Sequence, residues 1–250
     1  MSRRFIKKDG IHRRLEGWPL VFTILTTIAI LVGGLVEFLP LILVDKAVDK
    51  IATVEPWTPL ELEGRDLYIA EGCNSCHSQM VRPFRHEIER YGEYSKAGET
   101  IYERPFLWGS KRTGPDLARV GGKYPHLWHV RHMEDPQSTS PNSIMPPYPH
   151  MLENALDLSS LPTKLRRLKT LGTPYDEDMV ANAVEIAQTE AEAIAREIEA
   201  QGGPEGLEDK EIVALIAYLQ RLGADVQATP AAERPDAPSG TDAEEATASR

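Results

Sequence analysis

The sequence predicts a mainly α-helical protein in which one N-terminal transmembrane helix precedes a helical domain outside the membrane. Three observations support this fold class. Residues 18–44 form an almost wholly apolar run, residues 60–72 and 209–222 carry apolar side chains at helical spacing, and a C-x-x-C-H motif occupies residues 73–77. The run predicts the membrane helix, and the two patterned segments predict long helices near the two ends of the domain.

The apolar run from Trp18 to Val44 is long enough to cross a membrane. At about 1.5 Å per residue it reaches roughly 40 Å, and a hydrocarbon core is about 30 Å thick. A cleaved signal peptide fits less well, because its apolar region would be about 7–15 residues long and followed by a small-residue cleavage site. Gly33-Gly34 and Glu37 fit two readings equally: packing against a partner helix, or an ordinary membrane helix with Glu37 hydrated near the interface.

Charges on the two sides of the apolar run predict its orientation. After it, Lys46 and Lys50 are balanced by Asp45 and Asp49. Before it stand Arg3, Arg4, Lys7, Lys8, Arg13 and Arg14. The positive-inside rule therefore places the N-terminus in the cytoplasm and the rest of the chain outside. We expect a single-pass protein of a bacterial inner membrane with a periplasmic domain.

Acidic residues are concentrated in one part of the chain. The formal net charge is -10, and residues 176–211 hold twelve acidic against two basic residues. The acidity is therefore local, and no basic stripe of the kind that binds nucleic acid is present. We expect no nucleic-acid partner.

The C-x-x-C-H motif predicts a covalently bound haem c. Cys73 and Cys76 would form thioether bonds to the vinyl groups, and His77 would ligate the iron from one face. A zinc site would need further ligands from the loose histidine group within residues 126–132, whose spacing is not typical of zinc sites. A thioredoxin-like pair would require βαβ units, which the pattern does not predict. A chance motif with structural thiols is the remaining alternative.

Met145 is the predicted second axial ligand. A single haem is either six-coordinate for electron transfer or five-coordinate with an open site. Met145 lies in a proline-rich stretch, residues 141–149. Proline restricts the backbone and prevents helix formation, which suits a loop that holds a weak thioether ligand in place.

Other residues fit the role of second ligand less well. Met80 follows His77 by only three residues and cannot easily reach the opposite face of the haem. Met133 lies in a helix-like run and is predicted, like Met151, to be a packing residue. His150 or Met151 as ligand and an open site stay as alternatives.

The two patterned segments resemble the first and last helices of small cytochromes c. In the second, the candidate core residues are Ile212, Leu215, Ile216 and Leu219, and in the first they are Leu62, Leu67, Tyr68 and Ile69. The resemblance implies a class I-like cytochrome c domain in which these helices cross over one haem edge, with Tyr218 and Leu219 in the contact.

The run Thr113-Gly114-Pro115-Asp116-Leu117 resembles a loop that packs against the histidine ligand in cytochromes c. In such proteins the proline carbonyl accepts a hydrogen bond from the Nδ1 atom of that histidine. The resemblance gives this role to Pro115. Its physical effect would be to orient His77 and raise its basicity.

Three long runs resemble the membrane-anchored monohaem subunit of cbb(3)-type cytochrome c oxidases. They are GCNSCHSQMVRPFRHEIERYGEYSKAGE, YERPFLWGSKRTGPDLARVGGKYPHLWH and PNSIMPPYP. The likeness covers the anchor with Glu37 and about residues 60–175. The sequence departs from the family at His150, where a tryptophan is usual, and this affects the packing beside Met145.

The resemblance implies a function as well as a fold. It implies a complex with a haem-copper catalytic subunit, which reduces oxygen to water, and with a dihaem cytochrome c subunit. This chain would relay electrons through its haem and would have no catalytic site of its own. Two alternatives stay open: a free-standing membrane-tethered cytochrome c shuttle, and a non-haem metal-binding or assembly module.

Three further features of the sequence lead to expectations about surfaces and contacts. Residues 176–206 predict an acidic surface helix closed by Gly202-Gly203-Pro204, either simply solvated or docking a basic electron donor. One set of basic side chains is expected to pair with haem propionates or with acidic groups of the catalytic subunit, or to be ordinary surface cations: Arg82, Arg85, Lys111, Arg112, Arg119 and Lys123. One set of aromatic side chains is expected to pack in the haem pocket or at an interface, where burial alone would explain them: Phe106, Trp108 and Trp128.

The sequence thus predicts five regions along the chain. They are a cytoplasmic basic N-terminus (1–17), the transmembrane anchor (18–44), a linker (45–59), the periplasmic monohaem domain (60–224, with the acidic insertion 176–206) and a disordered acidic tail (225–250).

Overall fold

The computed structural model describes residues 11–43, 48–109 and 111–228. It divides into two compact units, Met1–Asp49 and Lys50–Arg250, which are treated separately below. The predicted mainly α-helical class is confirmed. The described ranges contain no strand, and their only β pairing is an isolated bridge between Ala155 and Lys210.

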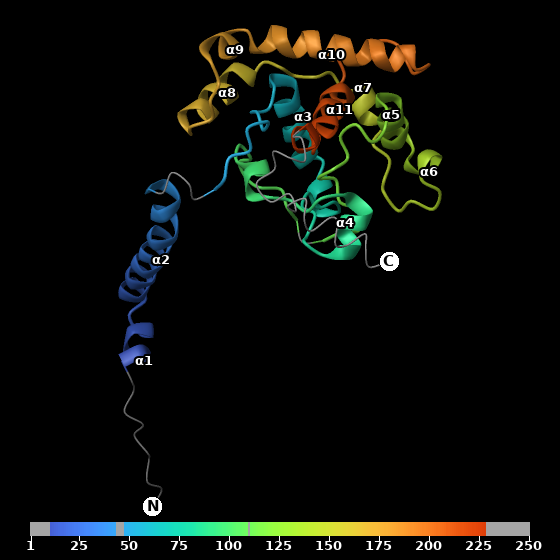
Figure 1. Ribbon diagram of the computed structural model, residues 1–250. Helices are drawn as coiled ribbons and strands as arrows, with labels where there is room; N and C mark the ends of the chain where they lie inside the picture. Colours follow the sequence, from blue (N-terminus) through green and yellow to red (C-terminus); the bar gives the residue numbers. More distant parts are fainter. Residues whose placement is uncertain (1–10, 44–47, 110, 229–250) are drawn as a thin grey trace, which may run out of the picture. The chain divides into compact units, whose positions relative to one another are not determined.

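The N-terminal unit consists of α1 (Ile11–Glu16) and α2 (Pro19–Leu43) (Figure 1). Helix α2 lies within the predicted anchor of residues 18–44: Trp18 precedes the helix, and Val44 lies outside the described residues. Its segment Pro19–Pro40 has a mean hydropathy of 2.3 and none of it is buried inside the protein. A helix of this length and composition that leaves its apolar side chains uncovered is suited to a lipid environment.

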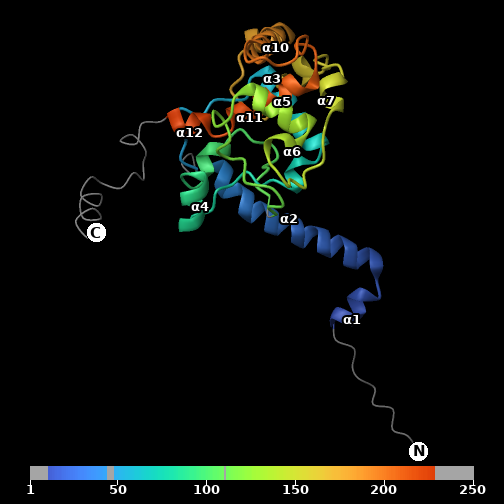
Figure 2. The same cartoon turned by 90° about the vertical axis from the view of Figure 1, so that its right-hand side faces the viewer.

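The C-terminal unit is built from helices and short 3-10 turns. They are α3 (Pro59–Ala70), η1 (Cys73–Ser75), α4 (Arg85–Tyr91), η2 (Ala97–Thr100), α5 (His126–Glu134), α6 (Pro136–Thr139), α7 (His150–Glu153), α8 (Leu161–Thr170), α9 (Glu177–Ala181), α10 (Ala183–Ala200), α11 (Glu211–Arg221) and α12 (Ala224–Ala228). Helix α10 runs along one side of this unit and α4 lies at the opposite side, with α3 and α11 between them (Figure 1 and Figure 2).

Helix α3 begins at a capping box. The Thr58 hydroxyl accepts a hydrogen bond from the Glu61 amide (3.3 Å), and the Glu61 carboxylate accepts one from the Thr58 amide (2.8 Å). Pro59 follows at the first helical position, where the missing N–H group is not needed. Local sequence thus determines where the helix starts.

The crossing of α3 and α11 forms the centre of the core, as the resemblance to small cytochromes c implied. Tyr68 of α3 packs on Tyr218 of α11, with ring centroids 5.4 Å apart. The Tyr218 hydroxyl also pairs with the side-chain amide of Gln79 (3.0 Å). The predicted core residues of α11, Ile212, Leu215, Ile216 and Leu219, are all buried.

Gly64 allows the two helices to approach each other closely. A Cβ atom added at Gly64 would overlap the backbone carbonyl of Ala214. We therefore expect Gly64→Ala to lower the free energy of unfolding by about 1–3 kcal/mol through overpacking. Thermal unfolding checks this, because such a loss lowers Tm by ~2–12 °C in a chain of this size. Ala70→Ser, at the exposed end of α3, is the control, and an unchanged Tm for Gly64→Ala would contradict the prediction.

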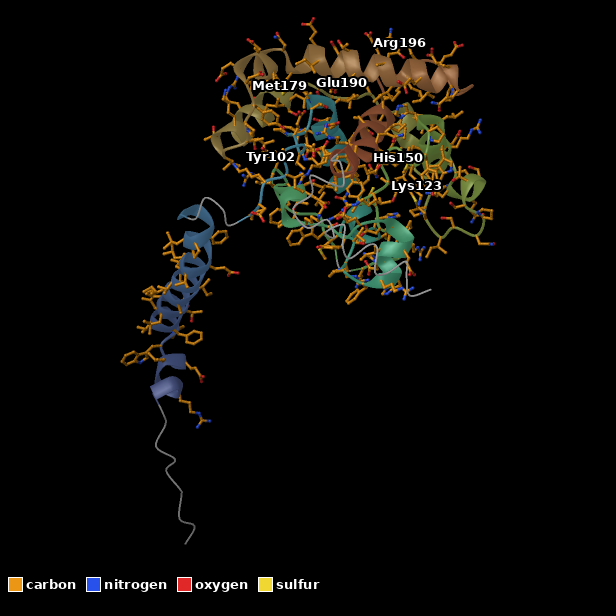
Figure 3. All side chains as sticks on the ribbon, viewed as in Figure 1. Tyr102, Lys123, His150, Met179, Glu190 and Arg196 are labelled. Atoms are coloured by element: carbon orange, nitrogen blue, oxygen red, sulfur yellow. The ribbon has the colours of Figure 1, made fainter. Side chains whose placement is uncertain are left out.

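The acidic segment 176–206 is more than a surface helix. It is split at Asn182 into α9 and α10, and α10 buries a stripe of small side chains against the core. The stripe consists of Ala183, Ala187, Ala191 and Ala195, and the larger side chain of Ile198 follows it; each is no more than 3% exposed. Glu190 accepts a hydrogen bond from the Thr58 hydroxyl at the start of α3 (2.9 Å), and Figure 3 labels it on the side of α10 opposite Arg196. The expectation of a merely solvated helix is therefore wrong for one of its faces.

The predicted boundary of the tail is early by a few residues. Helix α12 spans Ala224–Ala228, and the Asp225 carboxylate accepts a hydrogen bond from Arg221 (2.8 Å). The Asp225 carbonyl also accepts one from the Thr53 hydroxyl (2.8 Å) in the predicted linker. The linker and the chain after α11 therefore pack together, and residues 229–250 lie outside the described residues.

Candidate functional site

One large cavity lies in the C-terminal unit. Its volume is about 930 Å³, near the upper end of the roughly 300–1,000 Å³ typical of cofactor and ligand pockets. The end of α3, η1, the loop 113–120, α5, the loop 140–148 and α11 contribute to its walls. Elements that are far apart in the sequence therefore enclose one space.

The C-x-x-C-H motif lies at the wall of this cavity. Helix α3 stops at Glu71, and Gly72 turns the chain with a positive φ of 72°, a conformation that favours glycine. Cys73 and Cys76 follow on a 3-10 turn as free thiols. Burial and the charge of Glu71 raise the pKa of the Cys73 thiol to about 11, so that it is protonated at neutral pH.

The His77 ring is oriented by the loop 113–117. Its Nδ1 atom lies 2.8 Å from the carbonyl oxygen of Pro115, the contact that the resemblance implied. Burial lowers the pKa of His77, and the hydrogen bond to Pro115 partly opposes this effect. Because Nδ1 is engaged, Nε2 is the ring nitrogen left for another partner. Gly114 packs directly on the ring, and a Cβ atom there would overlap it.

Hydrogen bonds attach the loop 113–117 to the segment that follows the motif. The Gly114 amide donates to the Cys76 carbonyl (3.0 Å) and the Leu117 amide to the Ser78 carbonyl (2.8 Å). The buried Asp116 carboxylate accepts from the Ser78 hydroxyl (2.6 Å) and the Met80 amide (2.9 Å). These contacts hold the loop, and with it the Pro115 carbonyl, next to the segment that carries His77.

Two of the predicted basic candidates, Arg82 and Arg112, pair with the same carboxylate of the protein itself. Arg112 donates to Glu87 (2.7 Å) and to Asp116 (3.2 Å), and Arg82 also pairs with Glu87. Burial alone would raise the pKa of Glu87, but the hydrogen bonds from Arg112 and Arg82 outweigh it and lower this pKa to about 2.

The other basic candidates divide between ion pairs and exposed positions. Arg119 is held by Glu99 (2.7 Å), and Arg85 forms an exposed pair with Glu89. Lys111 and Lys123 are exposed. Of these four, Arg119 and Lys123 line the cavity.

Met145 lines the same cavity as His77. Interactions within the loop determine its conformation. Asn142 adopts a positive φ of 66°, and the Ser143 hydroxyl accepts a hydrogen bond from the Met145 amide (3.2 Å). The loop rejoins α5 where the Tyr148 amide donates to the Met133 carbonyl (2.7 Å).

The residues considered as alternatives to Met145 lie outside the cavity wall or are buried in the core. Met151 is 1% exposed and packs in the core, and neither it nor His150 or Met80 contributes to the cavity wall. The His150 ring, labelled in Figure 3, lies 3.2 Å from the Glu71 carboxylate. Met133 does reach the cavity wall, but as a buried residue of α5.

The aromatic candidates separate into two groups. Trp128 lines the cavity and stacks on Tyr124 with ring centroids 3.9 Å apart. Phe106 and Trp108 stack on each other 4.7 Å apart, do not line the cavity, and are 55% and 39% exposed. The second pair is therefore a surface feature beside the motif, since the Trp108 carbonyl accepts a hydrogen bond from the Gln79 amide.

Sequence reasoning treated the histidines of α5 only as poor zinc ligands. In the parts of the chain that the structure describes, no three His, Cys, Asp or Glu side chains gather as a metal site. His129 and His132 line the cavity instead, next to Trp128. The sequence did contain a signal for this placement. Trp128 and His129 are adjacent, and His132 follows three residues later on the same face of the predicted helix.

A membrane-length helix followed by a helical domain that encloses one cofactor-sized cavity, with a C-x-x-C-H motif in its wall, is the architecture of a membrane-anchored haem protein. A family model matches residues 12–226, and its description is cytochrome c oxidase, mono-heme subunit/FixO. The chain belongs to this family, the monohaem subunits of cbb(3)-type cytochrome c oxidases. A search of curated proteins finds no match.

Proposed function

We propose that this chain carries one covalent haem c and relays electrons towards the catalytic subunit of the oxidase. Cys73 and Cys76 form the thioether bonds, and His77 and Met145 are the axial ligands. The observation that carries the proposal is that all four side chains line the same cavity of about 930 Å³.

The residues around the cavity fit such a group. When bound, the haem supplies a one-electron couple, and a methionine ligand gives it a higher potential than a second histidine would. The Pro115 carbonyl keeps the proton of His77 on Nδ1 and so directs Nε2 to the iron. The apolar side chains of Leu215 and Leu219 exclude water from one wall.

The proposed topology places the N-terminus in the cytoplasm and the haem domain in the periplasm. The basic residues before α2 support this orientation. In the complex, the haem-copper catalytic subunit would accept the electrons and a dihaem cytochrome c subunit would be a further partner. The chain itself then needs no nucleophile, general acid or general base.

Purification of the full chain by a C-terminal tag, in mild detergent, tests this function. Reduced-minus-oxidised spectra and metal analysis of the product are the measurements. One covalent haem c that co-purifies with b-type haem and copper is the expected result. A lone haem c without them would favour a free-standing membrane-tethered shuttle, and a chain without haem would exclude both.

Gly114→Ala tests the role of the loop over His77. The added methyl group would overlap the imidazole, so we expect the ring to turn away from Pro115 and most of the low-spin haem signal to be lost. Absorption and electron paramagnetic resonance spectra of the ferric protein are the measurements. Lys111→Gln, at a nearby exposed residue that does not line the cavity, should leave them unchanged. A normal low-spin spectrum for Gly114→Ala would contradict the arrangement.

A further inference from the structure

His129 is a buried polar residue with no partner assigned to it so far. Its side chain lies on α5, only 2% of the residue is exposed, and it contributes to the cavity wall. Its Nε2 atom is fully buried and has no hydrogen-bond partner among the described residues. A buried nitrogen in this state is destabilising, and most such atoms in folded proteins are paired. A polar group of whatever fills the cavity is therefore expected at this point.

The neighbouring side chains do not satisfy His129, but they do hold it in place. Tyr124 and Trp128 both pack edge-on to its ring, with centroids 6.2 and 5.3 Å away. His132, one turn further along α5, is engaged through Nδ1 with the Thr139 hydroxyl (2.6 Å). The imidazole of His129 is thus fixed by aromatic contacts and has one nitrogen free to bind.

The same part of the cavity wall also carries a basic side chain. Lys123 lines the cavity with its Nζ atom 5.4 Å from the centre of the Tyr124 ring, and no ion pair is recorded for it within the described ranges. Arg119, by contrast, is already held by Glu99. A hydrogen-bond donor and an unpaired cation on either side of Tyr124 in the cavity wall favour a carboxylate.

Resting on the proposed function, we propose that His129 Nε2 donates a hydrogen bond to a propionate carboxylate of the haem. Haem carries its propionates on the edge opposite its vinyl groups, and the vinyl groups would be held at Cys73 and Cys76. A carboxylate enclosed by protein is destabilising unless it is hydrogen-bonded or paired. His129 satisfies that requirement, and its own orphaned nitrogen is satisfied in return.

The protonation state of His129 suits a hydrogen-bond donor. Burial and the charges of His126 and His132 lower its pKa to about 4, so the ring is neutral and donates from one nitrogen.

The test uses the full chain with its haem labelled at the propionate carboxylates with ¹³C. Redox-difference infrared spectra report those carboxylates directly, and a redox titration reports the iron. We expect His129→Phe to shift the labelled carboxylate band, because it removes the hydrogen bond. Without the hydrogen bond, more negative charge stays on the carboxylate, and this charge stabilises ferric iron. We expect the ratio of ferric to ferrous haem at a fixed solution potential to rise up to about tenfold, which corresponds to a fall in reduction potential of up to ~59 mV. His129→Gln, which keeps an N–H donor, should restore part of both effects.

His126→Gln is the matched control. His126 lies on the same helix but pairs with Glu197 and does not line the cavity, so its loss should change neither measurement. An unchanged carboxylate band in His129→Phe would overturn the inference. Loss of the wild-type iron ligation in His129→Phe would also overturn it, because it would make His129 an iron ligand.

Failure of this inference can be separated from failure of the proposed function. A wild-type chain without covalent haem overturns both. A normally ligated haem whose carboxylate band is insensitive to residue 129 overturns this inference alone. If His129→Phe does not acquire haem, the labelled carboxylate band of the wild type is compared with that of His129→Gln. Replacing the imidazole donor by an amide donor must shift this band if the inference is correct.

Discussion

Replacement of Cys73 and Cys76 together by serine is expected to abolish covalent haem in this chain. Serine is similar in size to cysteine but forms no thioether bond, and the two thiols are the only ones in the sequence. Haem staining of the chain after denaturing electrophoresis is the measurement, and essentially complete loss of the stained band is the expected result. Each single variant should retain a weaker band through the remaining thiol.

Ser75→Ala is the control for the cysteine variants. Ser75 is exposed between the two cysteines. Its hydroxyl donates to the Gly72 carbonyl (2.7 Å) at the same turn and lies 3.9 Å from the Cys76 sulfur. The variant should stain like the wild type. A double cysteine variant that keeps its haem through denaturation would exclude covalent attachment at this motif.

Met145→His is expected to keep the haem but to lower its reduction potential. Imidazole stabilises ferric iron more than a thioether does, and axial ligands set haem potentials over a range of about 0.8 V. We expect a fall on the order of 0.1 V or more. Redox titration of the purified chain measures it, and turnover of the oxidase should slow in parallel.

Met151→Leu distinguishes ligation at Met145 from a general effect of methionine replacement. Met151 is buried in the core away from the cavity, so leucine should cost less than about 1.5 kcal/mol of stability and leave the potential unchanged. An unchanged potential in Met145→His would remove Met145 as the proposed ligand. A change confined to Met151→Leu would transfer that role to Met151.

Local sequence signals were sufficient for the main helices. Apolar side chains that recur every three to four residues predicted α11, and the capping box at Thr58 explains the start of α3. The length and apolarity of residues 18–44 predicted α2. These signals are reliable because helix hydrogen bonds and caps join residues close together in the sequence.

The acidic helix α10 shows where such signals fail. Its glutamates indicated a solvated helix, yet Ala183, Ala187, Ala191 and Ala195 are buried at a spacing of four. Alanine adds little to hydropathy, so a stripe of alanines is a weak apolar signal among charged neighbours. It becomes a packing surface only because small side chains let a second helix approach closely, and the partner, α3, lies over a hundred residues earlier.

The sequence by itself determined the fold class, the membrane-length helix, the family and the residues proposed to hold the haem. Composition, helical periodicity and the spacing of a short motif carry that information, since each depends on neighbouring residues. Only the tertiary structure decided that Met145 and His77 share one cavity, that Pro115 contacts the His77 ring, and that His129 faces the same space without a partner. Such contacts arise when segments that are far apart in the sequence pack together. The free energy of that packing depends on several segments at once, so no single stretch of the sequence predicts it.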